Sequence, residues 1–321
     1  MKKISVLIPM YNEQEVLPAL YERVSALINR IPEYDWEIIM VNDGSKDNTA
    51  VIAMQIHAKD KRFHFIDLSR NYGKEVAMMA GFDVVSGDCV VIMDADLQHP
   101  PEVIPAMIAE WEKGYDDVYG ERITRGKEPW LRKKISLLYY HLLQKTTKTP
   151  ILENVGDFRL LDRSCIEAIK QLRETHRYTK GLYCYIGFKK TKVPFEQADR
   201  EVGQTKRNFF SLLGLAIEGL TSYTTMPLRL ATIMGSCVSL GAILYLIYII
   251  IKTLIVGEQV AGFPTLMVAI LLLGGITLLS LGIIGEYVGR IFNETKNRPN
   301  YFIREIDGKK VNTISYADLL D

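Results

Sequence analysis

Residues 90–101 read VVIMDADLQHPP, an apolar run that ends in two carboxylates one residue apart. A short apolar run bounded by proline is typical of a buried parallel strand, so Asp94 and Asp96 are expected where its carboxyl end enters a loop. Open α/β sheets bind ligands at that edge. The two carboxylates, with the amide oxygen of Gln98, offer the hard ligands that Mg²⁺ or Mn²⁺ prefers. The stretch predicts either a metal and diphosphate site or an Asp-rich turn that only caps the next helix.

Short apolar runs alternate with helical patterns through the first half of the chain. Strands are expected at 4–9, 37–41, 63–66 and 90–93, with helices between them, including 17–27 and 74–85. This alternation predicts an α/β fold with a Rossmann-like, mostly parallel sheet and crossover helices. Polar residues follow three of the strands, at Asn12 and Glu13, at Asp43, and at the carboxylates after residue 93. A shared ligand-binding edge is the simplest explanation of that recurrence.

Composition excludes several classes of protein. The 39 Lys and Arg residues against 38 Asp and Glu residues give a net charge of +1, so there is no overall electrostatic case for binding nucleic acid. The four cysteines lie far apart with no Cys-x-x-Cys pair, which indicates neither a disulfide framework nor a zinc site. Met1 to Lys3 lead directly into the first expected strand, so no signal peptide is expected.

Two long uncharged stretches, 230–251 and 259–285, follow the soluble half. The first has 22 residues, and at about 1.5 Å per residue it forms a helix of about 33 Å, long enough to cross a bilayer. The pair predicts a transmembrane hairpin; the alternative is two buried helices of a soluble core. Cations gather outside the hairpin, which predicts that both termini are cytoplasmic.

Six cations lie between Arg122 and Lys134, just before an apolar and aromatic helical pattern at 135–143. Basic residues joined to an apolar face are typical of a helix in the headgroup region, where they could hold an anionic lipid head. A solvated basic loop followed by a core-facing helix is the alternative. Residues 208–225 form a second interfacial candidate that leads into the first uncharged stretch.

Four segments in the soluble half resemble, in order, the motifs of family 2 glycosyltransferases with the GT-A fold. They are VLIPMYNE at 6–13, VNDGS at 41–45, RNYGKE at 70–75 and DADLQHP at 94–100. The resemblance is strongest to the polyprenyl-phosphate sugar transferases, and among these to the bactoprenol glucosyltransferase branch. It continues through VGDFRLLDR at 155–163, both uncharged stretches and GEYVGRI at 285–291, and so covers nearly the whole chain.

The resemblance implies a nucleotide-sugar donor at the sheet edge. Pro9, Tyr11 and Glu13 would contact the nucleoside, and Asp43 would hydrogen-bond the base. The residues alone leave simpler roles open, because Asp43 suits a turn and Glu13 could cap the first helix. Lys206 would contact the donor phosphates, or else belong to an ordinary basic loop. The divalent ion would be held by the three residues introduced first, Asp94, Asp96 and Gln98.

The same resemblance places a lipid phosphate acceptor near Asp157, which with Asp96 forms the predicted catalytic pair. The second pKa of a phosphate is about 6, so the acceptor is largely dianionic at neutral pH and needs no strong base. A single in-line displacement with inversion is therefore expected, and Asp157 would act as a base or only orient the acceptor. The residues expected to bind the acceptor phosphate are Arg122, Arg125, Lys127, Arg132 and Lys133.

These expectations combine into a membrane-bound enzyme that transfers glucose from UDP-glucose to undecaprenyl or another polyprenyl phosphate. The alternative donor is UDP-N-acetylglucosamine. The alternative function of another class is a non-catalytic membrane scaffold or lipid-transport partner. The resemblance also makes a homo-oligomer plausible. A processive polysaccharide synthase is excluded, because the Gln-x-x-Arg-Trp signature is missing and only two spans are expected. The expected divisions are a GT-A domain at 1–205, an interfacial helix at 206–227, two membrane helices at 228–290 and a cytoplasmic tail at 291–321.

Overall fold

The computed structural model describes residues 1–123, 155–175, 177, 179–196 and 262–311, with scattered helical positions between 233 and 255. The chain divides into two compact units, Met1–Asn208 with Arg298–Asp321, and Phe209–Asn297. The first contains a nine-stranded sheet in the order β7-β5-β6-β4-β1-β2-β3-β8-β9. Its strands are β1 (Lys3–Met10), β2 (Asp35–Asn42), β3 (Phe63–Leu68), β4 (Cys89–Ile92), β5 (Asp117–Arg122), β6 (Val155–Asp162), β7 (Lys190–Phe195), β8 (Ile303–Ile306) and β9 (Lys309–Lys310).

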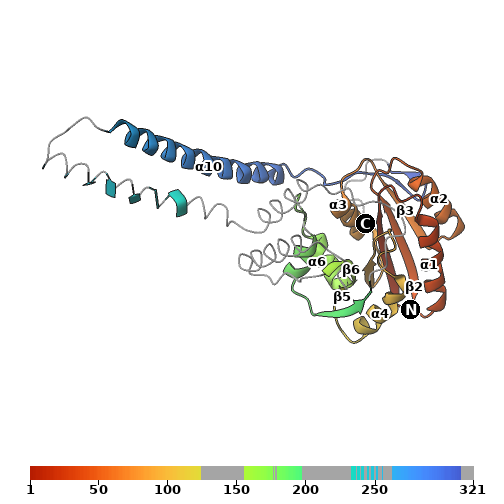
Figure 1. Ribbon diagram of the computed structural model, residues 1–321. Coiled ribbons are helices and arrows are strands. Elements are labelled where there is room, and N and C mark those ends of the chain that lie inside the picture. The colour runs from red at the N-terminus through yellow and green to blue at the C-terminus, as the bar shows by residue number, and fades with distance from the viewer. Residues whose placement is uncertain are drawn as a thin grey trace. The chain divides into compact units, whose positions relative to one another are not determined.

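Helices pack on both faces of this sheet. They are α1 (Leu17–Arg30), α2 (Thr49–Lys59), α3 (Lys74–Val84), the 3₁₀ turn η1 (Pro101–Val103), α4 (Ile104–Glu112), α6 (Arg163–Lys170) and α7 (Thr179–Tyr185). Figure 1 shows α1 and α2 on one side of the central strands and α3 on the other. Strands β1 to β4 and helices α1 and α3 match the elements expected from the sequence.

The central strands are apolar along their whole length because both of their faces are buried. In β1, Val6 and Ile8 belong to the core beneath α1 and α4, whereas Leu7 belongs to the core beneath α3 and α6. In β2, Ile38 and Ile39 divide between the two cores in the same way. This alternation fixes the register, since a slip of one residue would exchange the two faces.

Strands β4-β1-β2-β3 pair in parallel, as expected for crossover connections. Strand β6 lies antiparallel between β4 and β5, and β8 lies antiparallel to β3. The sheet is therefore mixed, and within the described residues β6 and β8 alone run against the other strands. The register sets Ile92 opposite Arg159, and because the strands are antiparallel, Asp94, two residues after Ile92, lies toward Asp157, two residues before Arg159.

The chain beyond residue 291, which the sequence predicts to be a tail, contributes to the sheet. Strand β8 pairs with β3 and then with β9, with Ile66 opposite Ile306 and Ile306 opposite Lys309. The sequence analysis did not predict these strands, because the four residues of β8, IREI, are too few to show the alternation typical of a strand. The edge of the N-terminal sheet is thus completed by the C-terminal segment.

The second unit contains α10 (Phe263–Thr295), whose first two-thirds is the second uncharged stretch. Residues Leu272–Thr295 are long and apolar enough to cross a membrane, and none of this window is buried. Near its end Arg290 Nε lies 3.1 Å from Glu286 Oε1, an ion pair across one helical turn. Of the first uncharged stretch, 230–251, the structure describes only scattered helical positions.

Candidate active site

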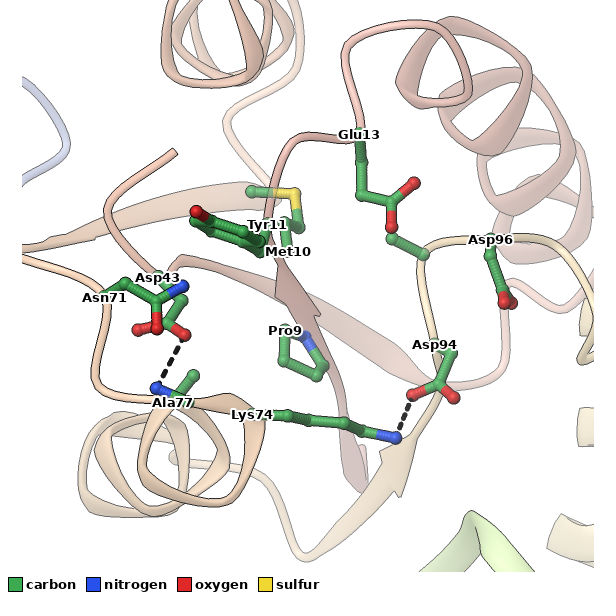
Figure 2. A pocket seen from close by; sticks show the side chains of 12 residues that line it. Pro9, Met10, Tyr11, Glu13, Asp43, Asn71, Lys74, Ala77, Asp94 and Asp96 are labelled. Carbon is green, nitrogen blue, oxygen red and sulfur yellow. Dashed lines mark hydrogen bonds and ion pairs between the residues drawn. The ribbon is translucent and has the colours of Figure 1, made fainter. Parts of the chain in front are cut away.

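A pocket of about 330 Å³ lies where β1, β2 and β4 end, at the edge where ligands bind in open α/β sheets. It brings together six of the residues that the sequence predicts for donor and metal binding, among them Pro9. Figure 2 shows their side chains around one hollow, with Lys74 reaching across to Asp94. The lining residues are Pro9, Met10, Tyr11, Glu13, Asp43, Asn71, Gly73, Lys74, Ala77, Asp94, Ala95 and Asp96.

The loop after β1 supplies the side of the pocket predicted for the nucleoside. Tyr11 is 40% exposed, which leaves its ring available for stacking. Asn12 has a left-handed backbone with φ of 56°, and this turn sends Tyr11 and Glu13 to the same hollow. The carbonyl of Glu13 accepts the N–H groups of Val16 and Leu17 at 3.1 Å, whereas its side chain lines the pocket. The backbone carbonyl of Glu13 therefore caps the start of α1.

Asp43, directly after β2, holds the loop that leads into α3. Its Oδ1 accepts the Tyr72 N–H at 2.7 Å and its Oδ2 accepts the Gly73 N–H at 2.8 Å. Burial raises the pKa of Asp43, although these two backbone donors oppose the shift. Gly44 permits the close approach: its φ is 62°, and a Cβ there would lie 2.5 Å from the carbonyl carbon of Arg70. Asp43 and Gly44 thus fix the start of α3 against the end of β2.

Asp94 and Asp96 both line the pocket after β4, and Ala95 lies between them. The backbone N–H of Gln98 donates to Asp96 Oδ1 at 3.2 Å, across a turn in which Leu97 has a φ of 58°. Gln98, the third predicted metal ligand, is not among the lining residues. The turn chemistry considered from the sequence is therefore present, and it presents two carboxylates to the same pocket.

His99 is packed and has no open ring face. The ring is 2% exposed, stacks on Phe158 at 4.9 Å with an interplanar angle of 6°, and meets the edge of Phe195. Its Nδ1 accepts the backbone N–H of Asp94 at 3.2 Å, so the ring holds the Asp94 backbone in place. Burial lowers the pKa of His99, which agrees with a neutral imidazole whose Nδ1 is an acceptor.

Lys74, the first residue of α3, joins the metal-ligand candidate to the catalytic candidate. Its Nζ lies 2.6 Å from Asp94 Oδ1 and 2.6 Å from Asp157 Oδ2, and its side chain is 39% exposed. Partial burial acts to lower the pKa of Lys74, but the two carboxylates outweigh it and hold that pKa above its ordinary value. The sequence interpretation gave Lys74 no role, although it stands in the RNYGKE segment directly after a glycine at a helix start. That placement is the signal that could have identified it.

Asp157 lies in β6 and is 8% exposed. Burial acts to raise the pKa of Asp157, but the charges of Lys74 and Lys180 outweigh it, so the pKa is lowered. Its second oxygen, Oδ1, is buried and has no hydrogen-bond partner in the described part of the chain. Asp157 is therefore a weak base, and no described residue uses the acceptor capacity of its Oδ1.

Arg159, two residues after Asp157 in β6, forms a buried ion pair that stabilises the sheet. It is 2% exposed, and its Nη1 donates to Asp117 Oδ2 at 3.0 Å and to Oδ1 at 3.2 Å. The guanidinium also lies over the ring of Tyr183, 3.8 Å from the centroid. This buried pair holds β6 against β5, and removing one partner of such a pair costs about 3–5 kcal/mol. The strand that carries Asp157 is thereby fixed.

Of the predicted acceptor-binding cations, the structure describes Arg122 alone. It ends β5, and a Cβ on Gly156 would lie 3.5 Å from its Nη2, so Arg122 lies beside the residue that precedes Asp157. Its Nε is buried without a hydrogen-bond partner among the described residues. The other predicted cations, Arg125, Lys127, Arg132, Lys133 and Lys206, lie outside the described residues.

A second group of potential metal ligands lies at the β3–β8 edge, outside the pocket lining. His57, His64 and Asp307 offer ligand atoms within 4.8 Å of one another. His64 Nδ1 lies 2.8 Å from Asp307 Oδ2, and His57 Nδ1 donates to the carbonyl of Phe63 at 2.7 Å. Local sequence spacing does not reveal this group, because Asp307 comes from the β8–β9 hairpin, far along the chain from both histidines. These contacts hold the β8–β9 hairpin against β3.

Comparison with known proteins agrees with this geometry. Residues 5–170 match the model of glycosyl transferase family 2, and residues 226–291 match the GtrB C-terminal hairpin. A solved structure of glucosyl-3-phosphoglycerate synthase from Mycobacterium tuberculosis, in complex with Mn²⁺, UDP and glucosyl-3-phosphoglycerate, aligns with a TM-score of 0.47 and 17% identity. That alignment covers 67% of this chain and 76% of the other.

Curated relatives align along nearly the full chain. The SfII prophage-derived bactoprenol glucosyl transferase of Shigella flexneri is 42% identical over 94% of this chain and 98% of its own length. The prophage bactoprenol glucosyl transferase homolog of Escherichia coli is 40% identical over 95% and 99%. An uncharacterized glycosyltransferase of Synechocystis is 42% identical over 95% and 96%. The α/β fold, the carboxylate-lined pocket and these matches lead to one conclusion: the chain is a glycosyltransferase and belongs to glycosyl transferase family 2.

Proposed function

We propose that this protein transfers glucose from UDP-glucose to undecaprenyl phosphate, or a related polyprenyl phosphate, at the cytoplasmic face of a membrane. The observation that carries the proposal is the single pocket in which Asp94 and Asp96 meet Tyr11, Glu13 and Asp43. The names of the relatives supply the chemical class of the acceptor and of the sugar. UDP-N-acetylglucosamine is the alternative donor.

In the proposed complex the nucleoside lies against Pro9, Tyr11 and Glu13. Both oxygens of Asp43 already accept a backbone N–H, and each carboxylate oxygen retains a further lone pair for a base N–H. Asp43 would then bind the base while it holds the loop that carries Asn71 and Lys74. A volume of about 330 Å³ suits a small polar ligand of this kind.

Asp94 and Asp96 would hold a divalent cation, and the residues present fit one. Both offer carboxylate oxygens to the same pocket, and the ammonium of Lys74 at 2.6 Å shows that a positive charge is already accommodated beside Asp94. Mg²⁺ or Mn²⁺ would offset the charge that develops on the departing diphosphate. The assignment of Gln98 as a third ligand stays a prediction, since its side chain is not in the pocket lining.

The chain's own residues then position the acceptor. A phosphate oxygen of the acceptor forms the bond to the anomeric carbon as the bond from that carbon to UDP breaks, with inversion. The lowered pKa of Asp157 suits an orienting role better than that of a base, in agreement with an acceptor that is already dianionic. Through Lys74, Asp157 is connected to the donor side of the site. Arg122, and by prediction the basic residues after it, would bind the acceptor phosphate.

The membrane arrangement is part of the proposal. Two helices within 228–290 would cross the bilayer, an interfacial helix at 206–227 would precede them, and both termini would be cytoplasmic. The apolar window Leu272–Thr295 and the match of residues 226–291 to a C-terminal hairpin support this arrangement. The GT-A part at 1–205 would then lie on the side of the membrane where nucleotide sugars are made.

The proposal is tested with the purified full chain, undecaprenyl phosphate and a panel of radiolabelled nucleotide sugars that includes UDP-glucose, UDP-N-acetylglucosamine and a GDP-sugar. We expect label to enter the lipid from UDP-glucose, to stop with EDTA and to return with excess Mn²⁺. Preferential transfer from another donor would correct the sugar. Transfer from none of the donors, with or without metal, would reject enzymatic activity and favour a scaffold role.

A further inference from the structure

The segment that follows α10 is tied to the end of β3. Besides the β8 ladder, Ser69 N–H donates to the carbonyl of Phe302 at 2.9 Å and Asp307 N–H donates to that of Phe65 at 2.8 Å. Asp307 Oδ1 also accepts the Phe65 N–H at 2.7 Å, across 242 positions of sequence. The C-terminal segment is therefore an integral part of the sheet that carries the pocket.

One side chain of β8, Arg304, is 56% exposed and reaches from the sheet surface to a buried carboxylate. Arg304 Nε donates to Asp67 Oδ2 at 2.7 Å, and its Nη2 bonds the same oxygen. Asp67 is 3% exposed, and its other oxygen accepts Asn42 Nδ2 at 2.8 Å. Asn42, the last residue of β2, is fully buried. A buried carboxylate requires such partners, so Arg304 supplies the charge that compensates Asp67.

The network continues from Asn42 to the nucleotide side of the pocket. Ser45 Oγ donates to Asn42 Oδ1 at 2.5 Å, and Ser45 Oγ in turn accepts the backbone N–H of Asn12 at 2.9 Å. Asn12 stands between Tyr11 and Glu13, which both line the pocket. An unbroken chain of hydrogen bonds therefore joins a residue after α10 to the loop predicted to contact the nucleoside.

Every donor in this chain points toward Asp67. The carboxylate can only accept, so the amide nitrogen of Asn42 must face it and the amide oxygen must face Ser45. The Ser45 hydroxyl then has to donate to Asn42, which leaves its oxygen to accept the Asn12 N–H. The three bonds from Asn12 through Ser45 and Asn42 to Asp67 run in one direction and strengthen one another, whereas Arg304 donates to Asp67 from the opposite side and neutralises its charge. Together these bonds hold Asn12 in its left-handed conformation, with φ of 56°.

We propose that Arg304 is a positioning residue for the donor nucleotide, acting through Asp67, Asn42 and Ser45 on the turn that carries Tyr11 and Glu13. The inference rests on the proposed function, because it assumes that this turn binds the nucleoside. It gives the segment after the membrane helix a part in donor binding, and not only in attaching the catalytic unit.

The test compares Arg304→Gln with Arg304→Lys and with Tyr301→Phe in the full chain. Tyr301→Phe removes the hydroxyl that bonds Asp83 and so loosens the same segment. It does not alter the relay, by which we mean the hydrogen-bonded chain from Arg304 through Asp67, Asn42 and Ser45 to Asn12. We expect Arg304→Gln to weaken UDP binding by about tenfold in calorimetry and to raise KM for UDP-glucose similarly, with kcat within about twofold, because the turn and not the reacting atoms is displaced. Arg304→Lys should recover part of the affinity, and Tyr301→Phe should keep it.

The outcomes separate the two proposals. A wild-type chain that binds no UDP and transfers no sugar rejects the proposed function itself. A wild-type chain that binds UDP while Arg304→Gln binds it equally well rejects the positioning role, and so does an equal loss in Tyr301→Phe. If Arg304→Gln does not fold, Ser45→Ala interrupts the relay at its other end, and unchanged UDP affinity in that variant also rejects the inference.

Discussion

Asp94→Asn should lower the rate of sugar transfer by about 10³-fold, equivalent to about 4 kcal/mol of transition-state stabilisation. The substitution keeps the shape of the side chain and the bond from the Asp94 backbone to His99, and it removes one of the two pocket carboxylates that are predicted to bind the metal. A divalent ion would then lose a charged ligand and would neutralise the departing diphosphate less well. The measurement is initial rate against Mn²⁺ concentration, and the midpoint for Mn²⁺ should rise together with the loss of rate.

Asp35→Asn is the matched control for this variant. Asp35 is an exposed carboxylate at the amino end of β2, the opposite end of the sheet from the pocket, so its loss should leave both the rate and the Mn²⁺ midpoint unchanged. A wild-type rate in Asp94→Asn at every Mn²⁺ concentration would remove Asp94 from the site. Equal losses in both variants would attribute the effect to net charge.

Lys74→Met should reduce turnover by about 10²-fold and lower the midpoint of thermal unfolding in the absence of metal. The ammonium contacts Asp94 and the buried Asp157, and a buried acceptor left without its partner costs about 1–3 kcal/mol. The loss of turnover follows because Asp157 would no longer be held in orientation. Added Mn²⁺ should raise the unfolding midpoint more in the variant than in the wild type, since the ion no longer competes with an ammonium at Asp94.

Lys192→Met provides the comparison for a lysine outside the site. Lys192 pairs with Glu121 at 2.9 Å, but its side chain is 57% exposed, and a pair this exposed to solvent contributes little to stability. That variant should therefore unfold and turn over like the wild type. Wild-type turnover and a wild-type response to Mn²⁺ in Lys74→Met would show that the Lys74 bridge has no part in the reaction.

The parts of the fold that the sequence predicts well are those in which local pattern and burial agree. Apolar runs such as 4–9 and 90–93 are buried on both faces, so their composition alone indicates central strands. Because parallel strands end at one edge, Asp43 and Asp94 could be placed together without coordinates. The pocket confirms that placement for the described residues.

The parts that the sequence could not predict depend on long-range pairing. Asp157 meets Lys74 because β6 inserts antiparallel beside β4, and no local pattern specifies that neighbour. Strand β8 is four residues long and pairs with a strand more than half the chain away, so neither the Arg304 relay nor the cluster of His57, His64 and Asp307 could be foreseen. The basic residues after Arg122 lie outside the described residues, and their role as acceptor ligands stays a prediction.

The central claim, that Asp94 and Asp96 hold the metal of a nucleotide-sugar site, is tested most directly by crystals of the full chain grown with UDP and Mn²⁺. An anomalous difference map locates manganese without reference to activity. We predict the strongest peak between the Asp94 and Asp96 carboxylates and the UDP diphosphate, with the nucleoside against Tyr11. A strongest peak at His57, His64 and Asp307, with none at Asp94 and Asp96, would contradict the account.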